Sequence, residues 1–228
     1  GYQNRYRTDS MYLHEACQDG ELGDIYFAKG HAIRRRAVPT WGVFLDEEAQ
    51  GGGPLIDIGT HALDLTLWMM DNYKPKYVVG KAYRELADTK NAANAWGPWD
   101  PEKFTVEDSA FGFIMMENGA SIFLESSWAL NTLDVKEAKT TLCGSKGGAD
   151  MNNGLTLNGE KRGHLYDNEI QLETGGVDFF DGAGSDPADV EAHMWIDAVL
   201  NDKELVVKPE EALVVTQILE GIYESSKT

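Results

Sequence analysis

The chain has 228 residues, more than one small domain needs and fewer than two average domains contain. Its 20 basic and 38 acidic residues give a formal net charge of −18, which excludes a surface that follows nucleic-acid phosphates and disfavours anionic membranes. A hydrophobic content of 42% is typical of a globular protein. No apolar run approaches the roughly 18 residues of a membrane span, and residues 1–5 lack a signal-peptide pattern, so the sequence predicts a cytoplasmic protein.

The first half of the chain predicts alternating helices and strands. Asp9 or Ser10 is a suitable cap for a helix ending near Cys17, and residues 24–33 alternate as a strand does. Gly51-Gly52-Gly53-Pro54 then predicts a sharp turn into a helix over residues 55–70, which is apolar over most of its circumference and should be buried. Cys17 and Cys143 belong to different elements, and we expect two free thiols.

The second half predicts mainly strands, followed by two helices. After a strand over residues 77–86, the long loop 87–104 is a candidate lid or interaction segment. Asn118-Gly119 suits the turn of a hairpin between residues 109–116 and 120–128. Further strands are expected over residues 139–143, 154–157 and 169–173, with Asn153-Gly154 and Asn158-Gly159 as turns, and helices over residues 187–200 and 209–226.

This order predicts an α+β fold. We expect a single open, mostly antiparallel β-sheet with helices packed on one face and the other face free for oligomerisation. Several strands carry apolar residues on both faces, for example Phe111, Phe113 and Met115 opposite Ala110 and Ile114. Something must cover the second apolar face, and we expect another copy of the chain.

The densest group of reactive side chains lies in the buried helix. Asp57 and His61 are four residues apart and Asp64 follows three later, so helical spacing places all three on one face. Burial of these groups requires partners for them. Three interpretations follow: Asp57 caps the helix while Asp64 holds a structural His61; His61 moves a proton while a carboxylate binds a substrate hydroxyl; or the group binds a metal.

Other polar and glycine-rich segments are less specific. Arg34-Arg35-Arg36 is either a strand end with one buried ion pair or a site for a polyol or phosphate. His193 could face the same cavity as the Asp57 group. Gly144-Ser145-Lys146-Gly147-Gly148 lacks phosphate-loop spacing and predicts a turn. The chain contains no GxGxxG, so we expect it not to form a complete dinucleotide site.

The segment from Gly51 to Asp64, GGGPLIDIGTHALD, resembles the GGGxLxDxGxHxxD signature of the C-terminal domain of the glucose–fructose oxidoreductase, inositol dehydrogenase and MocA family. The order of the flanking segments is similar too, from Arg5 and GELGDI at residues 20–25 to the last helix beginning PEEA at Pro209. The resemblance implies a C-terminal substrate-binding and oligomerisation domain over residues 1–228. It also implies that residues 1–8 form the strand that crosses from a Rossmann domain which this chain lacks.

The resemblance further implies a function and its residues. Asp57 and His61 match the family's active-site aspartate and histidine. Asp57 would position a hydroxyl of a sugar, sugar derivative or cyclitol. This hydroxyl would lose its proton to His61 or to a lysine of the missing Rossmann domain, while hydride passes to NAD or NADP. Arg36 and Trp41 are candidates for binding the substrate and Gln3 for approaching the cofactor, and we expect no metal. The chain alone is then a fragment that binds the cofactor weakly and is inactive, and its parent a homodimer or homotetramer joined through the sheet.

Two other functions remain open. The chain could be a non-catalytic assembly or binding module that uses its sheet face to recruit a partner. It could also be a metal-dependent isomerase or hydrolase, in which the aspartate and histidine are metal ligands and a further ligand comes from elsewhere in the chain.

Overall fold

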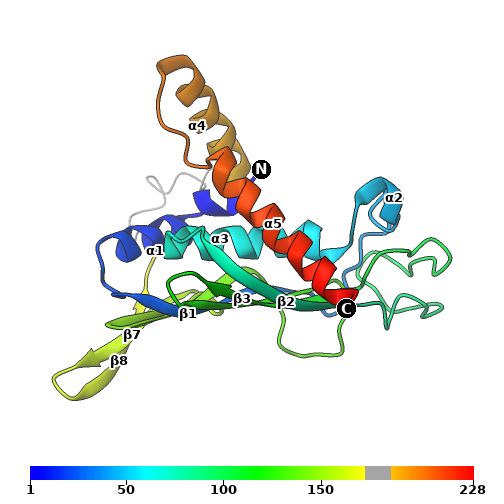
Figure 1. Cartoon of the computed structure of the whole chain (residues 1–228), viewed down its shortest axis with the longest axis horizontal. Helices are drawn as coiled ribbons and strands as arrows, with labels where there is room; N and C mark the ends of the chain where they lie inside the picture. The colour runs from blue at the N-terminus through cyan, green and yellow to red at the C-terminus, as the bar shows by residue number, and fades with distance from the viewer. Residues whose placement is uncertain (173–185) are drawn as a thin grey trace, which may run out of the picture.

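The computed structural model describes residues 1–172 and 186–228. Within these residues, eight strands form one sheet in the order β2-β3-β4-β1-β5-β6-β7-β8 (Figure 1). The central pair, β1 and β4, is parallel, and the other neighbouring strands are antiparallel, as predicted. The strands are β1 (Ile25–Ile33), β2 (Pro75–Tyr83), β3 (Ser109–Met116), β4 (Ser121–Ser127), β5 (Lys136–Gly144), β6 (Gly147–Asp150), β7 (Leu155–Lys161) and β8 (His164–Ile170).

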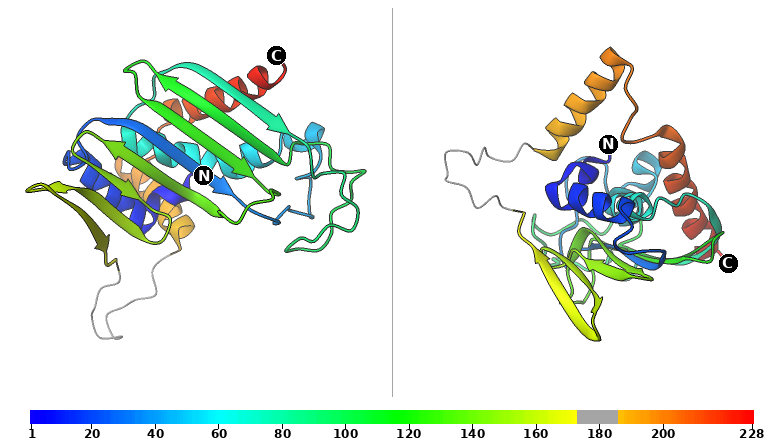
Figure 2. Two further views of the ribbon diagram at one scale, coloured as in Figure 1. Left: turned by 90° about the horizontal axis from the view of Figure 1, so that it is seen from below. Right: turned by 90° about the vertical axis from the view of Figure 1, so that its left-hand side faces the viewer.

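The helices gather on one side of the sheet, which confirms the α+β prediction. Helices α1 (Thr8–Gln18), α3 (Thr60–Met70) and α5 (Pro209–Ser226) lie over one face, whereas α4 (Pro187–Asn201) projects away from the body (Figures 1 and 2). Three short segments complete the set: the 3₁₀ helix η1 (Gln3–Tyr6), α2 (Glu47–Gln50) and the π-helix η2 (Leu55–Gly59). None of the described helices is long and apolar enough to cross a membrane.

The core lies between α3 and the central strands. Ala28 and Ala32 of β1, Ile114 of β3 and Leu124 of β4 are at most 1% exposed and face the helix layer. Gly30 allows α3 to approach closely, because a Cβ there would lie 3.2 Å from the carbonyl oxygen of Ala62. Eight of the eleven residues of α3 are buried, as the predicted apolar circumference requires.

The opposite face of the sheet is uncovered in the single chain (Figure 2, left). Val79 is 57% exposed there and Phe123 50%, and Phe113 lies 5.2 Å from Phe123 between ring centroids. His31 is buried on this face, where its Nδ1 lies 2.5 Å from Glu125 Oε1 and its Nε2 lies 2.9 Å from Thr141 Oγ1. This face therefore offers an apolar surface to the second copy of the chain that the sequence predicts.

Two predictions about the strands after β5 are wrong. Asn158-Gly159 lies within β7, and the turn to β8 falls at Arg162-Gly163, where both residues have positive φ. Gly159 serves packing instead, since a Cβ there would lie 2.8 Å from the hydroxyl oxygen of Tyr166. The strand predicted over residues 169–173 consequently starts at His164 and ends at Ile170, and residue 173 lies outside the described residues. The turn at Ser145-Lys146 is confirmed, although strand β6 follows it directly.

The N-terminal residues also differ from expectation. Residues 3–6 form the 3₁₀ turn η1 and not the strand that the resemblance implied. The reason is Arg5, whose side chain is completely buried and must point inward to reach the carboxylate of Asp64. Cys17 and Cys143 are free thiols, as predicted, and burial raises the pKa of Cys17 to about 12.

Candidate active site

The glycine-rich turn before η2 is packed around a buried carboxylate. Glu107 Oε2 accepts a hydrogen bond from the Gly53 amide (2.8 Å), while its Oε1 accepts from the Leu55 amide (3.1 Å) and the Tyr223 hydroxyl (2.8 Å). A Cβ at Gly52 would overlap the Tyr223 hydroxyl, and a Cβ at Gly53 would overlap the Glu107 carbonyl oxygen. The glycines therefore permit close packing, and the amides of Gly53 and Leu55 already donate to the Glu107 carboxylate.

The turn leads into a π-helical segment that carries Asp57. One π turn, η2, precedes α3, and its Asp57 amide donates to the Gly53 carbonyl over 3.1 Å. Such π turns inside helices often occur at functional sites. His61 follows in the first turn of α3. The sequence thus places an aspartate and a histidine at the junction of two kinds of helix.

Asp57 and His61 line one small pocket with a volume of about 240 Å³. Four elements and one connecting segment meet there: η1 contributes Gln3, η2 and α3 contribute the pair, β5 contributes Glu137, and Arg34 comes from the segment directly after β1. Charged and polar side chains make up most of its wall. The pocket therefore suits a small polyhydroxylated molecule better than an apolar one.

Asp57 accepts one hydrogen bond and lies near one cation, from two distant parts of the chain. The buried Trp128 donates its indole N–H to Asp57 Oδ2 over 2.8 Å, and Arg34 Nη1 lies 4.0 Å from the same oxygen. Arg34 is itself fixed by two hydrogen bonds to Glu137. Burial raises the pKa of Asp57, while Trp128, Arg34 and His61 oppose that rise.

His61 is a neutral imidazole with unused hydrogen-bonding capacity. Burial lowers its pKa below 6.5, although the charge of Asp57 partly opposes the shift. Its Nδ1 is buried, and no group of the described residues hydrogen bonds to it. The Tyr2 ring packs against the imidazole edge to face at 6.0 Å. A neutral imidazole beside a carboxylate is able to accept a proton from a bound hydroxyl.

Asp64 follows on α3 but does not line this pocket, because Arg5 occupies its carboxylate. Arg5 donates to both Asp64 oxygens, over 2.9 and 2.6 Å, and neither side chain is more than 1% exposed. The ion pair between Arg5 and Asp64 connects η1 to α3, and Asp64 makes no hydrogen bond to His61. This excludes the interpretation in which Asp64 holds a structural His61.

The other residues singled out from the sequence lie in different places. Gln3 lines the pocket. Arg36 does not line it and donates to the Arg35 carbonyl and Asn131 Oδ1. Trp41 is half exposed and lines a neighbouring cavity of about 440 Å³. His193 is exposed on α4 and contacts the Asp189 carbonyl, away from the Asp57 pocket.

Sequence reasoning did not single out Glu137 and Trp128, and within the cluster Arg34-Arg35-Arg36 it selected Arg36 and not Arg34, which lines the pocket. A usable signal existed for Arg34. Ala28 and Ala32 of β1 face the helices, and continued alternation places residue 34 on that face and residue 35 on the other. For Trp128, the only hint was that a buried indole N–H needs an acceptor.

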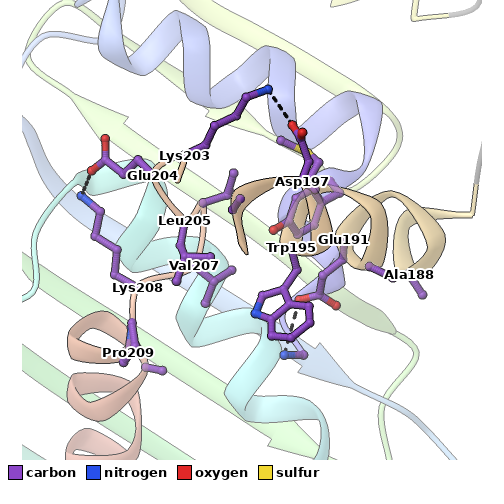
Figure 3. A pocket seen from close by; sticks show the side chains of 17 residues that line it. Ala188, Glu191, Trp195, Asp197, Lys203, Glu204, Leu205, Val207, Lys208 and Pro209 are labelled. Atoms are coloured by element: carbon purple, nitrogen blue, oxygen red, sulfur yellow. Dashed lines mark hydrogen bonds and ion pairs between the residues drawn. The ribbon is translucent and has the colours of Figure 1, made fainter. Parts of the chain in front are cut away.

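A larger groove lies between α4 and the segment that joins it to α5 (Figure 3). Its volume is about 430 Å³, and the Trp195 indole forms part of its wall. The charged groups at its rim are paired with each other, Lys203 with Asp197 and Lys208 with Glu204. The groove therefore offers no free acid and base pair. Across the described residues, no group of three or more His, Cys, Asp or Glu side chains is arranged to hold a metal ion.

Comparison with known proteins places this site in a family. The family model described as the GFO/IDH/MocA C-terminal domain matches residues 11–150, more than half of the chain. The chain belongs to the GFO/IDH/MocA oxidoreductase family. The match covers η2 and the first turn of α3, and so includes Asp57 and His61.

Individual relatives agree with this assignment. The chain is 32% identical to the D-glucoside 3-dehydrogenase of Escherichia coli K12 over 233 residues, covering 100% of this chain and 62% of that protein. An oxidoreductase domain protein from Kribbella flavida shares the fold with a TM-score of 0.81 at 18% identity, covering 100% of this chain and 63% of its own. Levoglucosan dehydrogenase, solved with NADH and L-sorbose, shares the fold with a TM-score of 0.75 at 16% identity. The match covers 99% of this chain and 62% of that protein. The chain thus spans about three-fifths of the length of these GFO/IDH/MocA proteins.

Proposed function

We propose that this chain is the substrate-binding domain of an NAD(P)-dependent oxidoreductase that oxidises a hydroxyl of a sugar, sugar derivative or cyclitol. The observation that carries the proposal is that Asp57 and His61 line one small polar pocket, in which the buried His61 Nδ1 has no hydrogen-bond partner among the described residues. The name of the D-glucoside 3-dehydrogenase supports a glucoside-like substrate. Residues 1–228 then act as one domain of a longer enzyme.

Each of three side chains has a separate role in the proposed deprotonation of the substrate hydroxyl. His61 accepts the proton of the reacting hydroxyl, because its imidazole is neutral at pH 7. Asp57 accepts a hydrogen bond from a neighbouring hydroxyl and stabilises the imidazolium that forms. Trp128 keeps the Asp57 carboxylate oriented through its 2.8 Å hydrogen bond. A positioned acid–base group of this kind contributes about 10²- to 10⁴-fold to the rate.

The glycine-rich turn before η2 does not fit the phosphates of a dinucleotide. Backbone amides at a glycine-rich helix start are the usual phosphate cradle, but here the Gly53 and Leu55 amides already donate to Glu107. We therefore propose that another domain of the longer enzyme holds NAD(P), which accepts the hydride, and that Gln3 of this pocket approaches it. The isolated chain should give no heat of binding with NAD or NADP, and tight binding would contradict the proposal.

The uncovered sheet face supports a second part of the proposal. We propose that two copies pair through this face, since Val79, Phe123 and their neighbours form an apolar surface that one chain leaves in water. Sedimentation should show a dimer or tetramer at micromolar concentration. A monomer at that concentration would contradict this assembly.

The catalytic assignment is tested by substitution in the longer enzyme. His61→Ala should lower kcat/KM for D-glucoside oxidation at least 100-fold, because the proton acceptor is lost. The matched control is His193→Ala, since His193 is exposed on α4 outside the pocket, and its kcat/KM should stay within twofold. If His61→Ala retains more than a tenth of the activity, His61 is not the proton acceptor.

A further inference from the structure

Two tryptophans, from separate loops, lie side by side in solvent next to the proposed active site. Trp41 follows β1 and Trp96 follows β2, and their side chains are 51% and 46% exposed. Their ring centroids are 4.9 Å apart and the planes are nearly perpendicular. Indoles are costly to leave in water, and exposed aromatic pairs of this kind are typical of binding surfaces.

The exposure of this indole pair is built into the structure. The Val38 amide donates to Asn94 Oδ1 over 2.8 Å, and Asn94 Nδ2 donates back to the Val38 carbonyl over 3.0 Å. The Thr40 hydroxyl also donates to the Trp96 carbonyl over 3.0 Å. These bonds tie the loop over residues 87–104 to the loop after β1, so the segment that the sequence suggested as a lid is held in place.

The indole pair adjoins the pocket along two routes. In the first, the Arg34 guanidinium lies 5.7 Å from the Trp96 ring centroid, and Arg34 Nη1 is 4.0 Å from Asp57 Oδ2. In the second, Phe44 lies between Trp41 (5.9 Å) and Trp128 (6.3 Å), whose indole N–H donates to Asp57. One side chain therefore separates Asp57 or its hydrogen-bond donor from each exposed indole.

We propose that Trp41 and Trp96 form a stacking subsite for the aglycone, or the second sugar ring, of a glycoside whose oxidised ring lies beside His61. The inference rests on the proposed function and specifies its substrate class: a glycoside with a ring beyond the reacting sugar. Indole faces pack well against aromatic rings and the C–H faces of sugar rings. The cavity beside Trp41, about 440 Å³ and lined also by Val43 and Lys103, has room for such a ring.

The test compares two probes that share the same sugar. Binding of methyl β-D-glucoside and 4-nitrophenyl β-D-glucoside to the 228-residue chain is measured by calorimetry. The aryl glucoside should bind about 3- to 10-fold more tightly, the range expected for one aromatic contact. Trp96→Ala and Trp41→Ala should each reduce this preference to less than twofold while leaving the affinity for methyl glucoside unchanged.

The matched control is Trp195→Ala, because Trp195 is 58% exposed on α4 and lies outside both loops. This variant should keep the full preference for the aryl glucoside. Equal affinities of the wild-type chain for the two probes, or a preference that survives Trp96→Ala, would overturn the subsite and leave the proposed function standing. Failure of the wild-type chain to bind either glucoside would overturn the proposed sugar site itself, and the subsite with it.

Discussion

The buried ion pair between Arg5 and Asp64 gives a prediction that can be worked out from the structure. Replacing Arg5 by Met leaves Asp64 buried at 1% exposure without the two hydrogen bonds it accepts from Arg5. Replacing Asp64 by Asn is milder, because Arg5 keeps its bonds to the Val206 carbonyl and to Glu211, each at 2.8 Å. Removing one partner of a buried pair costs about 3–5 kcal/mol. We expect Arg5→Met to lose about this much at pH 7 and Asp64→Asn about 2 kcal/mol.

The loss in Arg5→Met should depend on pH. Burial raises the pKa of Asp64, and Arg5 opposes that rise. Without Arg5, the folded carboxyl holds its proton to a higher pH than the unfolded one, whose pKa is about 3.9. The folded state then binds more protons, so stability falls as pH rises through that window. The loss should therefore be smaller at pH 5 than at pH 7, by up to about 2.7 kcal/mol at 1.36 kcal/mol per pH unit.

Urea unfolding, followed by tryptophan fluorescence at pH 5 and pH 7, measures both effects. Glu204→Gln serves as the control, since it breaks only the exposed pair with Lys208, and its free energy of unfolding should equal that of the wild type within error. A loss below 1 kcal/mol for Arg5→Met at pH 7 would refute the reasoning. Equal losses at the two pH values would refute the role given to Asp64.

Three further predictions concern the pocket and its support. Because burial lowers the pKa of His61, an NMR titration of its ring should give a midpoint below 6.5. Asp57→Asn should lower that midpoint further, because the charge of Asp57 raises the pKa of His61. A wild-type midpoint above 6.5 would contradict the assignment. Trp128→Phe removes a donor to the Asp57 carboxylate and should raise the pKa of Asp57, measured by carboxyl-carbon NMR, whereas an unchanged value would show that the indole does not orient it. Gly53→Ala forces a Cβ onto the Glu107 carbonyl oxygen and should cost about 3 kcal/mol in urea unfolding, and a cost below 1 kcal/mol would contradict the packing role of this glycine.

Local patterns in the sequence predict much of the fold. The apolar circumference of residues 55–70 predicts a buried helix, and the structure has one there, in which the π-helix η2 precedes the buried α3. Asn118-Gly119 predicts the β3–β4 hairpin, since Gly119 supplies the positive φ that the turn needs. Asn158-Gly159 has the same composition and misleads, because Gly159 lies inside β7, paired with Tyr166 of β8. Composition alone does not distinguish a glycine that forms a turn from one inside a strand.

The candidate site was predictable only in part, for a similar reason. The four-residue spacing brings Asp57 and His61 together because both lie on one continuous helical segment. Their supports come from distant parts of the chain, Trp128 from the end of β4 and Glu137 from β5, and only the folded sheet brings these close. Choosing Arg34 over Arg36 required knowing that β1 ends at Ile33. The ends of strands are the part of a structure that a sequence pattern predicts least reliably.

The hydrogen bonds around Glu107 link the candidate site to α5, which is synthesised after all eight described strands of the sheet. Tyr223 of α5 donates to the carboxylate that holds the Gly53 and Leu55 amides, and Glu211 of the same helix binds Arg5. A polypeptide still emerging from the ribosome can form β1, α3 and the β3–β4 hairpin, but it cannot yet fix the start of η2. A premature stop before α5 would therefore leave a chain with most of its sheet and a misplaced Asp57, so substrate binding would be lost before the fold is.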